Sequence, residues 1–169
     1  MATDDFSEYN VKWSHDKISR VGPSRWYREF PICSKGKLQS PINIRQAQEK
    51  IVTNASKLVL VNFKMAPNSL TIKNAEDSLY VYFNFNDPNN VPQITGGPLG
   101  DSRFNFTSMN IRWRSGHMIE SRHFEAELVL NFNGNVKVSL LMKVAEILFN
   151  LQMFTFVQIN NKYFFFTLS

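Results

Sequence analysis

The sequence predicts a mainly β fold, and three observations carry this prediction. Residues Lys57–Phe63 have the alternating faces of a strand. Strong turn signals separate the later apolar segments, at Asp87-Pro88-Asn89-Asn90 and at Gly96-Gly97-Pro98. Asn133-Gly134 stands between two further apolar segments and is the best hairpin signal in the chain. Repeats and heptads are absent from the sequence, so the pattern favours one sheet-based domain.

The elements follow in chain order. Residues 1–12 are polar, and we expect them to be frayed. Residues 13–45 contain Trp, Tyr, Phe and Pro without a helical or strand period, which predicts an irregular chain packed through its aromatic rings. In residues 46–56 the sequence predicts a short helical turn. The predicted strands are Lys57–Phe63, Leu70–Ile72, Ser78–Phe85, Arg103–Trp113, Phe124–Phe132 and Val136–Val144.

The C-terminal segment is harder to interpret. Val138–Ile159 is mostly apolar, but Lys143 and Glu146 interrupt it, and each charge near a bilayer centre costs about 2.5–3.5 kcal/mol. We therefore expect no membrane span, and predict a buried strand followed by a poorly specified end. Leu151–Ser169 is rich in Phe and has no clear period.

Composition bounds the function. The chain has 169 residues, 43% of them hydrophobic, and a net charge of +5, which excludes a disordered chain and gives no argument for nucleic acid. Its single cysteine, Cys33, excludes an internal disulfide and a multi-cysteine zinc site. Because the first residues contain no apolar run, we expect a cytoplasmic protein, secreted only if the true N-terminus is longer.

Several short motifs occur in an order that resembles one family. The first is Cys33-Ser34-Lys35-Gly36-Lys37-Leu38-Gln39-Ser40-Pro41-Ile42-Asn43-Ile44, preceded by Gly22-Pro23-Ser24-Arg25-Trp26. Later come Gly96-Gly97-Pro98-Leu99, Trp113, Ser115-Gly116-His117 and Glu127-Leu128. Together they resemble the α-carbonic anhydrases over about residues 13–145. The resemblance implies a largely antiparallel sheet with short peripheral helices, with the last third of the family domain absent from this chain.

Enzymes of that family hydrate carbon dioxide with a zinc ion held by three histidines, and the metal lowers the pKa of its water to about 7. Two of the histidines form His-x-His on one strand, where residues two apart share a face. In this chain the matching positions hold Asn110 and Arg112, and the third ligand position holds Val129. Asn is a weak neutral ligand, Val has no donor atom, and Arg is a permanent cation. We therefore expect no bound zinc and assign no catalytic residue.

The resemblance also implies roles for other positions. Gln39, Ser40, Trp113, His117 and Glu127 match scaffold residues of the family. Gly116 replaces a glutamate that orients the catalytic threonine, and Asp77 matches the proton-shuttle histidine. For Glu127 two partners are open, His117 and Arg112, since each would satisfy a buried carboxylate. If His117 is the partner, Arg112 is expected to reach solvent and to form a small anion-attracting pocket.

The remaining histidines and the thiol have plainer interpretations. His15 and His123 have no ligand spacing with His117, so a rebuilt zinc site is not expected, and we expect His123 at the surface. Cys33 is expected to be a free, partly buried thiol without a neighbouring base.

These observations predict three segments: a flexible 1–12, a partial carbonic-anhydrase-like domain 13–145, and an atypical Phe-rich tail 146–169. The leading functional hypothesis is a carbonic-anhydrase-related domain without catalysis, which binds an unknown protein or a small anion. The alternatives are a zinc-dependent carbonate dehydratase and an incomplete gene product of such an enzyme. The oligomeric state does not follow from the sequence.

Overall fold

The computed structural model describes residues 13–14, 16–37, 40–45, 47, 56–75, 78–143, 152–159 and 162–166, with the backbone alone for the last two segments. The chain divides into two compact units, Met1–Gln39 and Ser40–Ser169. The helical turn predicted in 46–56 lies outside the described residues except for residues 47 and 56.

Aromatic side chains hold the first unit together. The indole of Trp26 donates from Nε1 to the carbonyls of Ser14 and Val21, at 3.1 Å each, and the ring of Trp13 meets it edge-on with centroids 6.4 Å apart. This packing agrees with the sequence prediction. The fold class predicted short peripheral helices without placing them, and two lie in this unit, the 3-10 helix η1 (Pro23–Arg28) and α1 (Ile32–Lys35).

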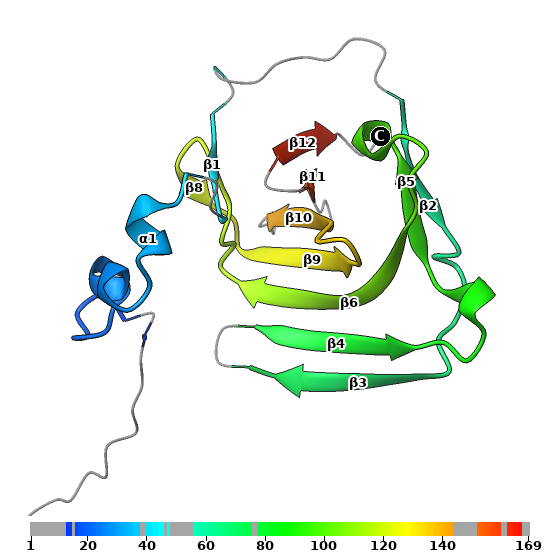
Figure 1. Cartoon of the computed structure of the whole chain (residues 1–169), viewed down its shortest axis with the longest axis horizontal. Helices are drawn as coiled ribbons and strands as arrows, with labels where there is room; N and C mark the ends of the chain where they lie inside the picture. Colours follow the sequence, from blue (N-terminus) through cyan, green and yellow to red (C-terminus); the bar gives the residue numbers. More distant parts are fainter. Residues whose placement is uncertain are drawn as a thin grey trace, which may run out of the picture. The chain divides into compact units, whose positions relative to one another are not determined.

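The second unit is built on a nine-stranded sheet. Its main path runs β12-β11-β10-β9-β6-β4-β3, and β5 adds to it through β6, with β2 paired to β5. All of these neighbours are antiparallel. Figure 1 shows β3, β4, β6, β9 and β10 side by side in this order. The strand bounds are β2 Leu58–Val61, β3 Ser69–Asn74, β4 Leu79–Asn84, β5 Gln93–Gly96, β6 Phe104–Trp113, β9 Ala126–Phe132, β10 Lys137–Lys143, β11 Gln152–Ile159 and β12 Lys162–Phe166.

A smaller sheet joins two distant parts of this unit. It has the order β1-β7-β8, with β1 Asn43–Ile44, β7 Met118–Ile119 and β8 Arg122–His123. The β1–β7 pair is parallel, with Asn43 beside Met118. Two 3-10 turns, η3 (Pro88–Asn90) and η4 (Gly97–Leu99), occupy the two turn signals that the sequence shows.

All six predicted strands are present, and the mainly β prediction is confirmed. Strands β5, β7 and β8 were missed because they are short and lack a clear alternation. The Phe-rich tail differs most from expectation. The whole of β10 pairs with β11, from Lys137 opposite Gln158 to Lys143 opposite Gln152, and β12 pairs with β11. The described parts of the tail, 152–159 and 162–166, therefore continue the main sheet rather than forming a poorly specified end.

The β9–β10 hairpin has a local explanation in the sequence. Gly134 has φ +65°, a conformation that an L side chain adopts only with strain, and a Cβ there would lie 2.9 Å from a ring carbon of Phe104. Asn135 follows with φ 58°. The amide of Phe132 donates to the carbonyl of Val136 at 2.9 Å and closes the turn.

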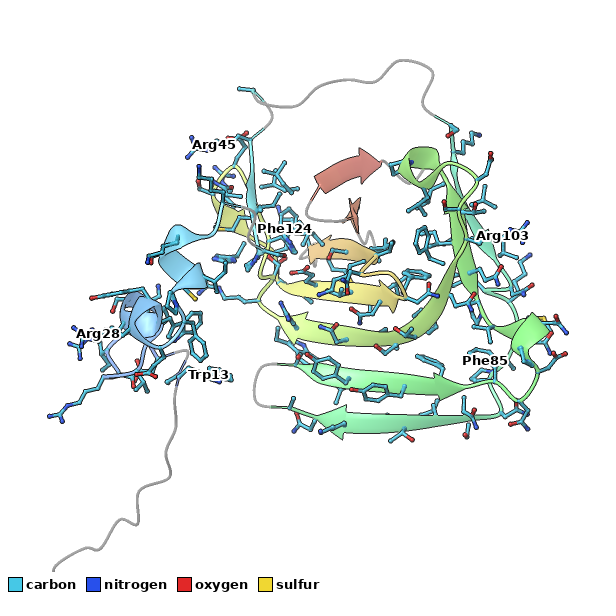
Figure 2. The ribbon with its side chains drawn as sticks, in the orientation of Figure 1. Trp13, Arg28, Arg45, Phe85, Arg103 and Phe124 are labelled. Atoms are coloured by element: carbon cyan, nitrogen blue, oxygen red, sulfur yellow. The ribbon has the colours of Figure 1, made fainter. Side chains whose placement is uncertain are left out.

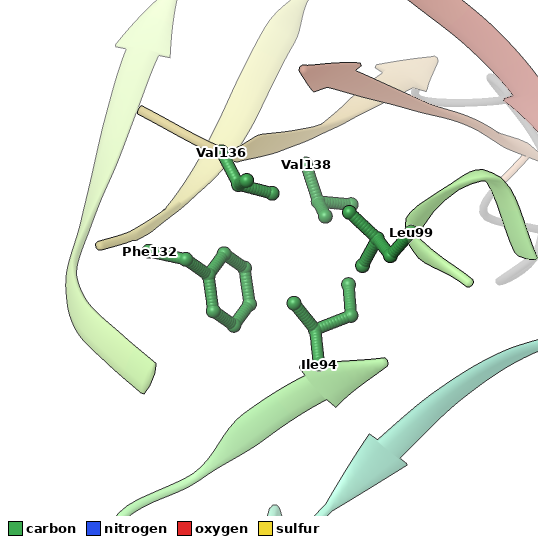
Figure 3. Packing of buried hydrophobic residues seen from close by; sticks show 5 residues of the cluster. All are labelled: Ile94, Leu99, Phe132, Val136 and Val138. Carbon is green, nitrogen blue, oxygen red and sulfur yellow. The ribbon is translucent and has the colours of Figure 1, made fainter. Parts of the chain in front are cut away.

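Two hydrophobic clusters lie on the sheet. Figure 3 shows the larger one, in which Ile94 and Leu99 meet three residues of β9, β10 and their turn, namely Phe132, Val136 and Val138. The smaller one joins Ile44 to Leu141, with Phe124, labelled in Figure 2, packed against them. The second cluster fixes the β1 end of the small sheet against β10.

Candidate functional site

Two neighbouring strands bring the matched positions together. In the antiparallel register of β6 and β9, Asn110 lies opposite Val129 and Arg112 lies opposite Glu127. Opposite residues of an antiparallel pair share a face, and so do residues two apart on one strand. All four residues therefore lie on one face of the sheet, as the sequence predicts for Asn110, Arg112, Glu127 and Val129.

Glu127 is fully buried and its two oxygens are both engaged. Oε1 lies 2.6 Å from Nδ1 of His117. Oε2 accepts the backbone amides of Gly116, at 2.8 Å, and of His117, at 3.2 Å. Of the two partners that the sequence left open for Glu127, His117 makes this contact.

The environment of Glu127 favours its ionised form. Burial raises the pKa of this carboxyl, but the hydrogen bond and charge of His117, its backbone amide and the hydroxyl of Ser139 together outweigh burial and lower the pKa from 4.5 to about 2. An ionised carboxylate can only accept, so the imidazole donates to it through Nδ1.

The other side of the His117 ring meets the start of this unit. Nε2 of His117 lies 3.1 Å from the hydroxyl oxygen of Ser40. This distance allows a hydrogen bond between the ring nitrogen and the hydroxyl. Ser40 and Glu127 thus hold the two nitrogens of His117 from opposite sides of the ring.

Ser115 shapes the segment that carries His117. Its hydroxyl donates to the carbonyl of His117 at 2.6 Å and accepts the amide of Phe124 at 2.8 Å. Its own carbonyl accepts Nδ1 of His123 at 2.7 Å. The sequence analysis quotes Ser115 only as part of a motif and assigns no role to Ser115 or to Ser139.

A second polar cluster lies beside the first on the same face. Nδ2 of Asn131 donates to Oδ1 of Asn110 at 3.1 Å and to the hydroxyl of Ser108 at 3.3 Å. Asn110 is only 4% exposed. Its own Nδ2 is buried and has no hydrogen-bond partner within the described part of the chain. Asn110 therefore presents a buried donor at the first of the matched ligand positions.

Arg112 reaches toward the segment that carries His117. A Cβ built on Gly116 would lie 3.4 Å from Nη1 of Arg112 and 3.5 Å from Oε2 of Glu127. The side chain is partly exposed, while its Nε atom is buried. Both the guanidinium of Arg112 and the carboxylate of Glu127 therefore lie close to Gly116, at the position where the family motif has a glutamate.

The residues at this site do not fit a zinc ion. Structural and catalytic zinc sites use Cys, His, Asp or Glu donors, and the three matched positions supply an amide, a guanidinium and an aliphatic chain. Across the residues that the structure describes, no group of three or more His, Cys, Asp or Glu side chains is placed to hold a metal.

The other predicted residues are placed as follows. Trp113 is 69% exposed and so lies outside the buried cluster. His123 is exposed, as expected, and its Nδ1 is bonded to the carbonyl of Ser115. Cys33 is exposed, which corrects the expectation of a partly buried thiol: the short helix α1 buries none of its residues. Gln39, His15 and Asp77 lie outside the described residues.

No helix among the described residues has the length and apolar character to cross a membrane.

Comparisons with known sequences place these features in a family context. A family model described as eukaryotic-type carbonic anhydrase matches residues 21–161, further into the Phe-rich tail than the motifs alone indicate. The chain is 35% identical over 102 residues to carbonic anhydrase 7 of Homo sapiens, covering 60% of this chain and 36% of that protein. It is 28% identical over 136 residues to alpha carbonic anhydrase 7 of Arabidopsis thaliana, covering 78% and 44%. The chain spans about half the length, or less, of these curated relatives.

Solved structures share the fold at low sequence identity. Dioscorin complexed with ascorbate matches with a TM-score of 0.62 at 20% identity, over 79% of this chain and 55% of that one. The α-carbonic anhydrase of Photobacterium profundum matches with a TM-score of 0.56 at 14% identity, over 80% and 57%. The architecture, the ordered motifs and the family match agree, and the chain belongs to the family of eukaryotic-type carbonic anhydrases.

Proposed function

We propose that this chain is a member of the family that does not hydrate carbon dioxide and acts as a binding domain for a small oxyanion. The observation that carries the proposal is Arg112. It places a permanent positive charge at a position where the family motif has a zinc-ligating histidine, and it does so on the same face as Asn110 and Val129.

A cation at this position works against a metal and in favour of an anion. The guanidinium would repel Zn²⁺, and it presents several N–H donors in a fork that matches oxyanions. Asn110, two residues away on the same strand face, adds a buried amide donor without a partner among the described residues. Two donors in this arrangement suit a ligand with several acceptor oxygens.

The negative charge nearby is already engaged. Both oxygens of Glu127 accept hydrogen bonds from the His117 segment. The solved structure of dioscorin with ascorbate supports a binding function, because there a protein of this fold holds a small organic acid.

Zinc content and hydration activity test the loss of catalysis. The purified chain, incubated with zinc and dialysed, is expected to retain far less than one zinc per chain by elemental analysis. It is expected to hydrate carbon dioxide no faster than a buffer blank. Stoichiometric zinc that a chelator removes together with activity would contradict the proposal and favour a carbonate dehydratase.

Thermal shift titrations with bicarbonate, sulfate and ascorbate test the binding function. We expect at least one of these anions to raise the melting temperature of the wild-type chain, and expect Arg112→Gln to abolish the shift. Arg103→Gln is the matched control, since it removes the same charge from an exposed residue just before the opposite end of β6 (Figure 2). Equal shifts in both variants would show that binding does not involve Arg112.

A further inference from the structure

We infer that the anion site takes an aromatic carboxylate, with its carboxylate on Asn110 and Arg112 and its ring against Tyr80 of β4. This ligand class rests on the proposed function, since it specifies the oxyanion of the same site. β4 lies beside β6 in the sheet (Figure 1), and Tyr80 stands directly opposite Asn110 in the register of the two strands. An aromatic residue therefore neighbours the buried amide donor.

Tyr80 lies on the face that the matched positions share. Opposite residues of an antiparallel pair lie on one face of the sheet, with Cβ atoms about 4.5–5.5 Å apart. Tyr80, Asn110 and Val129 therefore form one row across β4, β6 and β9. The row contains an aromatic ring, a carboxamide and an aliphatic side chain. This combination suits a ligand that has both a ring and a polar group.

Tyr80 belongs to a pair of nearly parallel rings. Its ring centroid lies 6.3 Å from that of Tyr82, and the two ring planes differ by 15°. Each ring can turn only one of its faces to the other, so the second face of Tyr80 can take a further ring. Aromatic rings associate at centroid distances of about 4.5–7 Å, in offset-stacked or edge-to-face arrangements. The ring of Tyr80 therefore favours an aromatic ligand over a saturated one.

Asn110 supplies the first anchor for the carboxylate. Its Oδ1 accepts from Nδ2 of Asn131 at 3.1 Å. The oxygen and the nitrogen of one carboxamide point apart, so Nδ2 of Asn110 is directed away from Asn131. This nitrogen is buried and has no hydrogen-bond partner within the described residues, which is unfavourable for a donor shielded from water. A carboxylate oxygen placed beside it would supply the missing acceptor.

Arg112 supplies the second anchor and the positive charge. It follows Asn110 by two residues on β6, so the two side chains share a face. A guanidinium forms charge-assisted hydrogen bonds with a carboxylate, and the two carboxylate oxygens can meet donors on both side chains. A small inorganic anion would meet the same donors but would make no use of the ring of Tyr80. We therefore expect the site to discriminate between anions by the ring that they carry.

Three acids of equal charge test the contribution of the ring. Benzoate, cyclohexanecarboxylate and acetate each carry one carboxylate, and the first two differ mainly in whether the ring is aromatic. Isothermal titration of the purified chain measures the dissociation constant of each acid. We expect benzoate to bind about tenfold more tightly than acetate, because it buries its ring, and about threefold more tightly than cyclohexanecarboxylate, because only benzoate has a π face.

Substitutions at Tyr80 test which residue meets the ring. Tyr80→Leu keeps an apolar side chain but removes the ring, so we expect it to weaken benzoate about threefold and to leave acetate unchanged. Tyr80→Phe keeps the ring and is expected to bind benzoate as wild type does. Tyr27→Leu is the matched control, since it removes an exposed tyrosine of the first unit. Circular dichroism checks that each variant retains its fold.

Arg112→Gln separates the ligand class from the anion site itself. A preference for benzoate that is lost in Tyr80→Leu, with binding lost in Arg112→Gln, supports both. Equal dissociation constants for the three acids, or a preference for benzoate that survives Tyr80→Leu, would overturn the aromatic class assigned to Tyr80 while the anion site stands. Binding that Arg112→Gln does not change, or no binding of these acids, bicarbonate or sulfate, would contradict the anion site and the aromatic class with it.

Discussion

Two polar clusters on one face of the β6–β9 strand pair differ in how completely their hydrogen-bonding groups are satisfied. Around Glu127 both carboxylate oxygens and both ring nitrogens of His117 have partners. Around Asn110 the amide oxygen has a partner and the amide nitrogen has none among the described residues. The two clusters therefore differ in role. The Glu127 cluster holds the backbone of the His117 segment, and its hydrogen-bonding groups all have partners. The Asn110 cluster lies at the matched ligand positions, and one of its donors has none among the described residues.

The strongest test of this contrast is to supply the missing ligands. The triple substitution Asn110→His, Arg112→His and Val129→His places three imidazoles on one face, two on β6 and one directly opposite on β9. We expect zinc to bind at one per chain and to raise the melting temperature, with a gain in affinity of several orders of magnitude over wild type.

The matched control keeps three histidines but moves one of them to the other face, with Ile111→His in place of Arg112→His. Elemental analysis after dialysis gives the zinc content of both variants. Equal zinc in the two would show that the three positions do not converge as the register places them.

Removing the charge of Glu127 is expected to have the next largest effect. Glu127→Gln leaves His117 Nδ1 and two backbone amides facing a neutral amide, and loss of one partner of a buried pair costs about 3–5 kcal/mol. Urea unfolding measures this loss. Glu125→Gln, the same change at an exposed neighbouring position, is expected to change the free energy of unfolding by less than about 0.5 kcal/mol.

Lowering the pH removes the charge of Glu127 gradually, without a substitution. The pKa of Glu127 is about 2 in the folded chain and near 4.5 without its partners, so folding releases a proton from this group at intermediate pH. Its contribution to stability is full above about pH 4.5 and is lost as the pH falls toward 2.

The readout is the difference in the free energy of unfolding between wild type and Glu127→Gln. We expect this difference to shrink steadily between about pH 5 and pH 2.5. A difference that stays constant across the range would mean that the carboxylate contributes no charge-dependent stability in the folded state.

The smallest effect is expected at the second cluster. Asn110→Leu has two opposing effects on stability. It removes the hydrogen bond that Oδ1 accepts from Asn131, which destabilises the fold. It also removes a buried amide donor that has no partner in the described part of the chain, which offsets that loss. We expect the free energy of unfolding to change by less than about 1 kcal/mol. A loss as large as that of Glu127→Gln would show that both clusters support the fold equally.

The sequence predicted the parts of this molecule whose signals are local. Alternation and turn residues located β2, β4, β6, β9 and β10, and ordered motifs located His117 and Glu127. The strands β11 and β12 were missed because their Phe-rich sequence has no period, and their pairing with β10 is decided by tertiary context. The bonds of Ser115 and Ser139 were missed for a related reason, since a serine gives no indication in the sequence of the distant group it will bond.

The parallel contact between β1 and β7 has a consequence for the order of folding. From β9 to β12 each strand pairs with the next one along the chain, so this part of the sheet closes only short loops. The β1–β7 pair joins Asn43 to Met118, and the bond between Ser40 and His117 spans a similar length of chain. Closing so long a loop has a larger entropic cost than closing a short one, and this cost precedes the stabilising contacts. Strands β9 to β12 are therefore expected to assemble first. The His117 ring is expected to acquire Ser40 as its second partner only at the end of folding.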